Sequence, residues 1–442
     1  MKHPFSPLTI FLILAAAYLT LGQVAQVAAP KAVVAQAGQG GRLMELRWAA
    51  AYGNEGESGT LLETLGKKFN VSLESLDAQG KPPKDAKNPW DVAVESVLLA
   101  EGGKPEEATV ALEFAPKGLF RVCWEAAYAS GPIPSSADIE LVAGGLSNGL
   151  AARLLEATIA ARRGGQIEEM AKADILTEYK KKGVALSVIA LLLFVGALCG
   201  LGIGIRELAK RPPLADLPRF QMSAIYALNV CLGWYVCFFL SSTVAGFIAK
   251  TVQLGAWALP LNYSLHAICG IAFICVAEKI SPLALWRRLS KKGWRWPMNG
   301  VRFLLLALVL TLTTAWLLSF VTPESDQPQR ELIELISGSK GVLPILAVFG
   351  TVAFLGPMFE EIFFRGFLLS VFRRQLPAAG ALVLSSVLFA SIHFDLQTIP
   401  LLAVLGCALA LAFMRTGDIK TAVFVHGCWN GGVFLFQRIL MT

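Results

Sequence analysis

The chain has 442 residues, of which 55% are hydrophobic and only 16% are charged. Soluble domains carry about 25% charged residues, so this composition excludes an ordinary soluble protein and predicts that lipid surrounds most of the chain. The formal net charge of +7 does not indicate nucleic-acid binding, because the basic residues cluster at the ends of hydrophobic segments, where they encode topology. The predicted partner is therefore the lipid bilayer, with no nucleic acid.

Residues 1–29 contain the first apolar run, 8–21, which follows Lys2. This run is short for a membrane span, and it fits either an uncleaved signal anchor or a signal peptide. The small residues at 27–29 resemble a cleavage site, whereas Pro30 disfavours cleavage. In both cases the segment that follows leaves the cytoplasm.

Residues 30–182 hold a large share of the Glu, Asp and Lys residues. Apolar residues recur at three- and four-residue spacing in four stretches of this segment, which indicates α-helices. These stretches are 91–101, 106–114, 119–129 and 137–163. We expect a mostly α-helical extracytoplasmic domain with a scaffolding or partner-binding role, and its single Cys123 cannot form a disulfide within it.

The rest of the chain alternates apolar segments with short polar ones, which predicts an all-α, polytopic transmembrane helix bundle of about eight to nine membrane segments. The predicted spans are 184–205, 221–249, 259–277, 303–322, 341–357, 379–394, 398–414 and 421–440. Residues 183–299 form accessory transmembrane helices in this interpretation. Residues 300–442 form a separate core, because they carry nearly all of the candidate chemistry.

The orientation follows from the charges of two loops. The stretch 278–302 holds seven basic residues and one acid, whereas 323–340 holds four acids and two basic residues. By the positive-inside rule the first stretch is cytoplasmic and the second external. We therefore predict a multi-pass protein of the plasma (inner) membrane with a cytoplasmic N-terminus and residues 30–182 outside.

Three charges lie in one apolar segment, at Glu360, Glu361 and Arg365. Each costs about 2.5–3.5 kcal/mol at the centre of a membrane helix, so they should face the protein interior. Glu361 and Arg365 are four residues apart and should pair, whereas Glu360 points about 100° away and is free to handle protons. The Gly356-Pro357 pair should break the preceding helix, which would place both acids near a new helix start, where the dipole favours carboxylate.

Further polar residues occupy two later apolar segments. His393 ends one of them, and His426 and Asn430 lie four residues apart in the other, on one helical face. Each alone is common as a hydrogen bond between membrane helices. The combination of all three with Glu360 instead predicts a chemical site, in which His426 and Asn430 present two donors to one oxygen.

The ordered motifs Glu360-Glu361-x-x-x-Arg365, Phe389-x-x-x-His393 and His426-x-x-x-Asn430 resemble those of the CAAX prenyl protease and bacteriocin-processing family of intramembrane proteases, over roughly residues 300–440. The resemblance implies a glutamate-type endopeptidase with a protein or peptide substrate, and it makes residues 300–442 the protease core. Glu360 and His393 would activate water, and His426 with Asn430 would form the oxyanion hole. The candidate catalytic residues are Glu360, Glu361, Arg365, His393, His426 and Asn430.

No cofactor is required by the sequence. A zinc ion held by Glu360, His393 and His426 is chemically feasible, but the chain has no His-Glu-x-x-His signature, so a need for metal stays open. His266 is interpreted as structural and Asp395 as a loop cap. Two alternative functions also stay open: a non-catalytic scaffold or immunity-type family member, and a proton-coupled transporter, for which no inverted repeat is visible.

Overall fold

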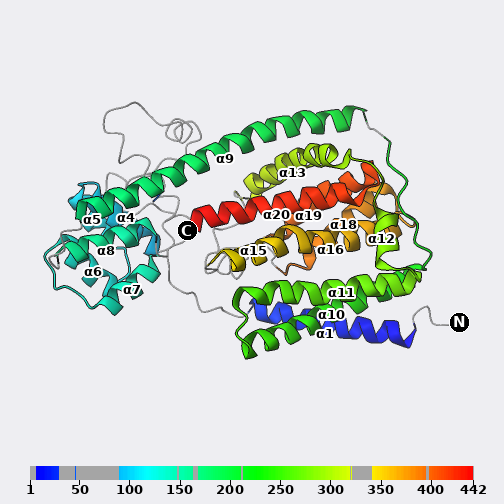
Figure 1. Cartoon of the computed structure of the whole chain (residues 1–442), viewed down its shortest axis with the longest axis horizontal. Helices are drawn as coiled ribbons and strands as arrows, with labels where there is room; N and C mark the ends of the chain where they lie inside the picture. Colours follow the sequence, from blue (N-terminus) through cyan, green and yellow to red (C-terminus); the bar gives the residue numbers. More distant parts are fainter. Residues whose placement is uncertain are drawn as a thin grey trace. The chain divides into compact units, whose positions relative to one another are not determined.

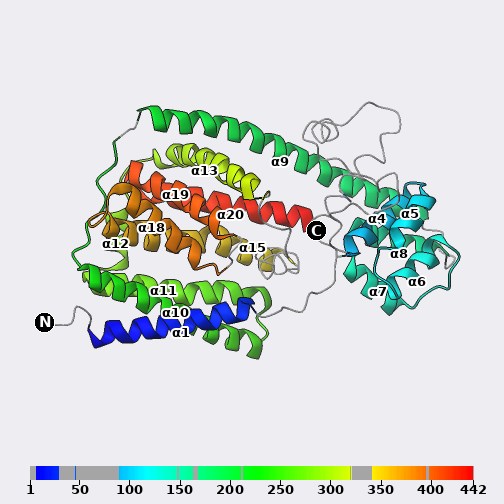
Figure 2. The same cartoon turned by 180° about the vertical axis from the view of Figure 1, so that it is seen from behind.

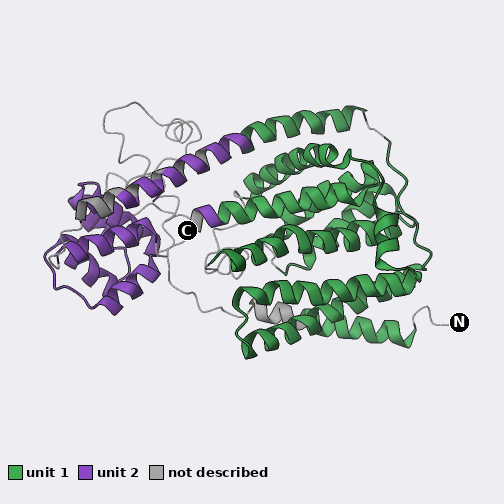
Figure 3. Cartoon of the chain, in the orientation of Figure 1, with its two compact units in different colours: residues 1–30, 193–437 green, residues 31–192, 438–442 purple. Residues whose placement is uncertain are grey.

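The computed structural model describes residues 6–28, 45, 89–146, 149–162, 168–210, 213–318, 320, 341–394 and 398–441. Within these ranges every regular element is a helix, which confirms the predicted all-α class. The chain divides into unit 1, residues 1–30 and 193–437, and unit 2, residues 31–192 and 438–442 (Figure 3). Helix α9 (Glu168–Lys210) continues without a break past the predicted domain boundary at residue 182.

The described residues of unit 2 include five short helices, which are α4 (Pro89–Glu101), α5 (Pro105–Leu112), α6 (Leu119–Tyr128), α7 (Ser136–Gly145) and α8 (Leu150–Arg162). Local signals fix several of their starts. Pro105 opens α5 with two acids in its first turn, and Ser135 and Asp138 form a reciprocal capping box at α7. Phe120, Cys123 and Trp124 of α6 are buried in the unit's apolar core.

The Cys123 thiol should resist alkylation in the folded protein. Its side chain is buried, and burial together with the negative charge of Asp138 raises its pKa to about 11. Little thiolate, the reactive form, therefore exists at pH 8. Maleimide labelling followed by peptide mass spectrometry should show Cys123 modified only after denaturation, and rapid labelling in the native state would contradict this packing.

Unit 1 contains the apolar helices. In the part of the chain that the structure describes, six helices are long and apolar enough to cross a membrane: Val188–Lys210, Ala224–Thr251, Gly255–Glu278, Trp296–Leu318, Val342–Phe372 and Ile399–Thr416. Two shorter apolar helices, Pro7–Thr20 and Ala378–Ser391, add to them. The chain is an integral membrane protein, and the predicted eight to nine segments included such short helices and the more polar C-terminal one.

The helices of unit 1 pack in pairs that bring distant parts of the chain together (Figures 1 and 2). Helix α10 (Ala224–Thr251) lies between α1 (Pro7–Ala28) and α11 (Ala258–Glu278). Helix α19 (Ile399–Thr416) packs against both α13 (Trp296–Leu318) and α18 (Ala378–Ser391). The short helix α12 (Pro282–Leu289) lies between α11 and α13 in the sequence, and α20 (Ile419–Met441) follows α19. The acidic stretch 323–340 lies outside the described residues.

The segment Val342–Phe372 is one continuous helical span made of successive pieces. These are α15 (Val342–Gly350), the π-helical η2 (Thr351–Leu355), α16 (Gly356–Glu360), the π-helical η3 (Glu361–Leu369) and α17 (Ser370–Phe372). The prediction that Gly356-Pro357 breaks the helix is therefore wrong. The wider π-turn ahead of Pro357 accommodates a residue that has no N–H to donate, and π-turns of this kind are frequent at functional sites.

Candidate active site

Glu361 lies at the centre of the polar cluster in unit 1. Its Oε1 accepts hydrogen bonds from Arg365 Nη1 and His426 Nδ1, each at 2.9 Å. The side chains of Glu361 and Arg365 are fully buried. The expected Glu361–Arg365 pair is therefore present, but the same carboxylate oxygen also binds His426, which the sequence did not predict.

Arg365 is fixed by two further neighbours, Gly406 and Phe389. Its Nη2 donates to the carbonyl oxygen of Gly406 at 3.3 Å, and its guanidinium lies 4.2 Å from the centre of the Phe389 ring. A Cβ atom at Gly406 would lie 3.0 Å from the Cβ of Ser386 and 3.3 Å from Arg365 Nη2. The glycine in α19 therefore leaves the room that the guanidinium occupies.

Glu360 faces the other nitrogen of the same imidazole. Its Oε2 lies 3.8 Å from His426 Nε2, which is longer than a hydrogen bond. Glu360 Oε2 and His426 Nε2 can therefore each still form a hydrogen bond with an oxygen atom of another group. His266, predicted to be structural, is buried beside this carboxylate, with its ring 5.6 Å from that of Phe359 and 4.9 Å from that of Tyr263.

Phe389 contacts three of the predicted site residues at once. Besides Arg365, its ring lies 5.3 Å from the ring of His393 and 5.5 Å from that of His426. Its carbonyl oxygen is 3.1 Å from His393 Nδ1. A carbonyl oxygen can only accept, so Nδ1 carries the hydrogen and Nε2 of a neutral His393 is left as an acceptor. This role of Phe389 was not predicted, although its position one helical turn before His393 indicates that the two residues share a helical face.

Asn430 is held against the first π-helical segment. Its Nδ2 donates to the carbonyl oxygen of Val352 at 3.2 Å. One turn earlier, a Cβ atom at Gly427 would lie only 2.5 Å from the carbonyl oxygen of Ala353. The absence of a side chain at Gly427 thus allows α20 to approach η2 and brings His426 within reach of both carboxylates.

We expect Gly427→Ala to lower any activity of this site by up to about 10²-fold, because the new methyl group meets a backbone oxygen that cannot rotate away and displaces His426. The matched control is Gly432→Ala on the same helix, where nothing lies within 4 Å of the added atom. Parallel rate measurements on the two variants check this. Equal rates for both variants would show that the close approach is not needed.

The prediction that Glu360 and Glu361 lie near a helix start is wrong. Glu360 and Glu361 are not at a helix start, since the helical winding continues through them, so no free N-terminal amides stabilise their carboxylates. Arg365 and His426 supply the compensating donors instead. Asp395, interpreted as a loop cap, lies outside the described residues.

A zinc site at Glu360, His393 and His426 stays a prediction. In the described part of the chain, no three His, Cys, Asp or Glu side chains are grouped closely enough to hold a metal ion. His426 Nδ1 is bonded to Glu361, and His393 Nδ1 is directed to the carbonyl of Phe389.

Part of the chain matches the model of a known protein family. Residues 342–432, which hold all six predicted site residues, match the model of the type II CAAX prenyl endopeptidase Rce1-like family. This segment is similar to that family, and we call residues 342–432 the Rce1-like core. The matched segment runs from the start of α15 into α20, so it includes both π-helical segments and the glycine at 427.

Curated relatives share low sequence identity with the chain. YdiL of Bacillus subtilis, described as a membrane peptidase, is 28% identical over 95 residues, which are 22% of this chain and 38% of that protein. The membrane-embedded CAAX protease MroQ of Staphylococcus aureus is 27% identical over 196 residues, or 42% of this chain and 77% of MroQ. The chain thus spans well under half the length of YdiL. No solved structure matches the chain.

Proposed function

We propose that the chain is an intramembrane endopeptidase of the CAAX protease-like class that hydrolyses a peptide bond in a protein or peptide substrate. The observation that carries this proposal is the placement of His426 between Glu360 and Glu361 inside the Rce1-like core. Four polar side chains from α16, η3 and α20 thereby lie close together inside an apolar bundle, and they are those of Glu360, Glu361, Arg365 and His426. Such groups are costly in lipid and indicate a functional site.

In the proposed mechanism, Glu360 and His393 activate the attacking water. Glu360 is the carboxylate without a direct hydrogen bond to Arg365 or His426, so it retains the capacity to accept a proton. His393, with Nδ1–H held by the Phe389 carbonyl, offers Nε2 as a second acceptor. General base catalysis of this kind contributes about 10²–10⁴-fold to a rate.

His426 and Asn430 then stabilise the oxyanion. Because Nδ1–H of His426 is donated to Glu361, its Nε2 can donate to the oxyanion only when both ring nitrogens carry a hydrogen. Asn430 uses one N–H on the Val352 carbonyl and keeps a second for the oxyanion. Loss of one such donor costs about 10²–10³-fold in rate.

The proposed setting is the plasma (inner) membrane, with the N-terminus cytoplasmic and residues 30–182 external. The basic stretch 278–302, which spans α12 and the start of α13, supports this orientation. Protease added outside intact cells or spheroplasts should cleave unit 2. Complete protection of unit 2 until the membrane is permeabilised would reverse the orientation.

The function is tested first in cells and then with purified protein. Membrane-protein termini are compared between cells with the native chain and cells with Glu360→Ala, and a fragment that disappears in the variant identifies a substrate. Cleavage of that substrate is then measured in proteoliposomes, with and without a zinc chelator. If Glu360→Ala, His393→Ala and His426→Ala all cleave at the native rate, the proposed site is wrong; an ion flux that Glu360→Gln abolishes without any cleavage would indicate transport.

A further inference from the structure

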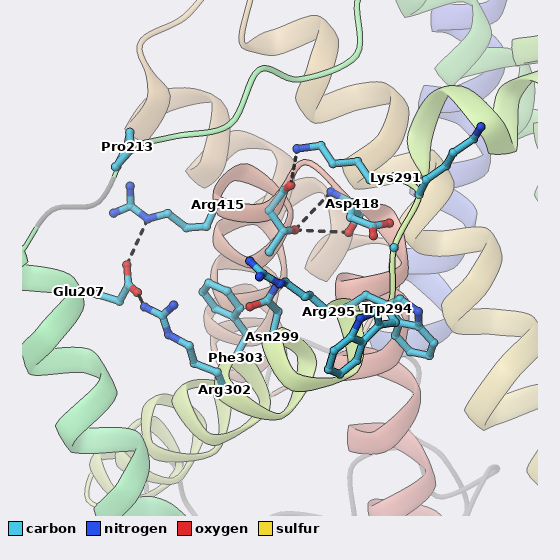
Figure 4. A pocket seen from close by; sticks show the side chains of 14 residues that line it. Glu207, Pro213, Lys291, Trp294, Arg295, Asn299, Arg302, Phe303, Arg415 and Asp418 are labelled. Carbon is cyan, nitrogen blue, oxygen red and sulfur yellow. Dashed lines mark hydrogen bonds and ion pairs between the residues drawn. The ribbon is translucent and has the colours of Figure 1, made fainter.

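A polar pocket lies in unit 1, formed by the ends of α9, α13 and α19 and the loop before α13 (Figure 4). Its cavity volume is about 530 Å³. None of the six candidate catalytic residues lines it. It is therefore a separate feature of the membrane unit that the proposed proteolysis does not use.

The side chains around this pocket carry an excess of positive charge. Five cations line it, from two separated parts of the chain, and they are Lys291, Lys292, Arg295, Arg302 and Arg415. Only two carboxylates, Glu207 and Asp418, lie among them. The pocket thus gathers like charges into a concavity, which is unfavourable unless an anion enters it.

The two acids are already engaged. Glu207 is buried and forms ion pairs with Arg302 and with Arg415, the latter at 3.2 Å, and Asp418 pairs with Lys420 at 3.5 Å. Figure 4 shows Glu207, Arg302 and Arg415 on one side of the pocket and Arg295 with Trp294 on the other. Among the residues that the structure describes, no carboxylate pairs with Lys292 or Arg295.

The backbone adds to this positive field. Helix α13 begins at Trp296 and is 23 residues long, so the positive end of its dipole lies at the pocket, where Asn299 also contributes a side-chain amide. Trp294 is 78% exposed beside the cations. Tryptophan at the end of an apolar helix is typical of the level of lipid headgroups.

The ordinary explanation of these cations is topology, since basic residues mark the cytoplasmic ends of membrane helices. That rule explains how many there are on this side, but it does not require them to converge. Here a buried carboxylate positions two arginines from different helices, α13 and α19, at one cavity. Such preorganisation is what a binding site needs.

We propose that this pocket binds a phosphate group carried by an anionic lipid headgroup, with Lys292 and Arg295 as the residues that neutralise it. Arg302 and Arg415, fixed by Glu207, and the start of α13 form the rest of the cradle. An anionic phosphodiester matches the surplus of positive charge, and the position at helix ends with exposed tryptophan favours a headgroup over a soluble ligand. The same phosphate chemistry also fits free inorganic phosphate, so the experiment separates the two.

The test uses the full chain in a neutral detergent, titrated separately with short-chain phosphatidylglycerol, short-chain phosphatidylcholine and inorganic phosphate, with binding measured by native mass spectrometry and calorimetry. The variant is Lys292→Gln/Arg295→Gln, and both positions are exposed, so the fold should be retained. The control, Lys279→Gln/Arg287→Gln, removes the same charges from exposed positions outside the pocket. Unfolding temperatures of both variants are recorded alongside.

We expect saturable binding of phosphatidylglycerol that the pocket variant weakens about 30-fold and the control leaves unchanged. Binding should also weaken as salt rises, because the exposed cations are screened. Phosphate binding as tight as that of phosphatidylglycerol, lost in the pocket variant, would overturn the lipid and assign a soluble phosphate site. Absent binding, equal binding of phosphatidylcholine, or the same affinity in both variants would overturn the proposal altogether.

Discussion

Glu360→Gln should lower the rate of substrate cleavage by about 10²–10⁴-fold with little change in stability. Glutamine has the same shape as glutamate, but its amide cannot accept a proton at neutral pH. Glu360 has no direct hydrogen bond to His426, at 3.8 Å, so the replacement breaks no structural contact of that pair. Initial rates in proteoliposomes, together with an unfolding curve of the purified variant, measure both effects.

The matched control for this variant is Asp216→Asn, the same carboxylate-to-amide change at an exposed loop position of unit 1. It should cleave at the native rate. A native rate for Glu360→Gln as well would remove Glu360 from proton transfer. A loss of stability as large as the loss of rate would instead show that the carboxylate is structural.

Arg365→Met should destabilise the protein by about 3–5 kcal/mol, because it leaves the Glu361 carboxylate buried without its cationic partner. Both side chains are fully buried, and Arg365 also bonds to the Gly406 carbonyl and stacks on Phe389. Methionine fills similar volume without charge. Unfolding by sodium dodecyl sulfate, followed by circular dichroism, gives the change in the free energy of unfolding.

The double variant Glu361→Gln/Arg365→Met separates charge from packing. Removing both charges together should restore most of the stability that Arg365→Met loses, since no buried charge is then left unpaired. Its cleavage rate should stay low, because His426 Nδ1 loses the carboxylate that orients it. A double variant as unstable as the single one would mean that packing around the guanidinium, rather than the ion pair, dominates.

The helical class and the membrane setting were predictable because they depend on composition and on long apolar runs. The Glu361–Arg365 pair was predictable too, since four-residue spacing on a helix brings the two side chains together whatever surrounds them. The continuity of the helix through Pro357 was not. It depends on the hydrogen-bond register of the π-turn ahead of the proline, which local propensity does not specify.

The parts of the site that the sequence missed are contacts between distant segments. Glu361 binds His426 across 65 positions, and Gly427 matters only because α20 approaches the carbonyl of Ala353. Phe389 acquires its importance from three neighbours that lie on other turns or other helices. The polar pocket is assembled in the same way, from Glu207, the loop before α13 and the end of α19.

The two π-helical segments around α16 have a consequence for how this span meets lipid. A π-turn holds about one residue more than an α-turn, so each one offsets the direction of the following side chains by about 100°. Glu360 is the last residue of α16 and Glu361 the first of the second π-helical segment, in which all nine residues are buried. Packing against α11, α18 and α19 keeps these residues away from the hydrocarbon, and the uninterrupted helix leaves no break in its backbone hydrogen bonding in a medium that cannot solvate free backbone groups.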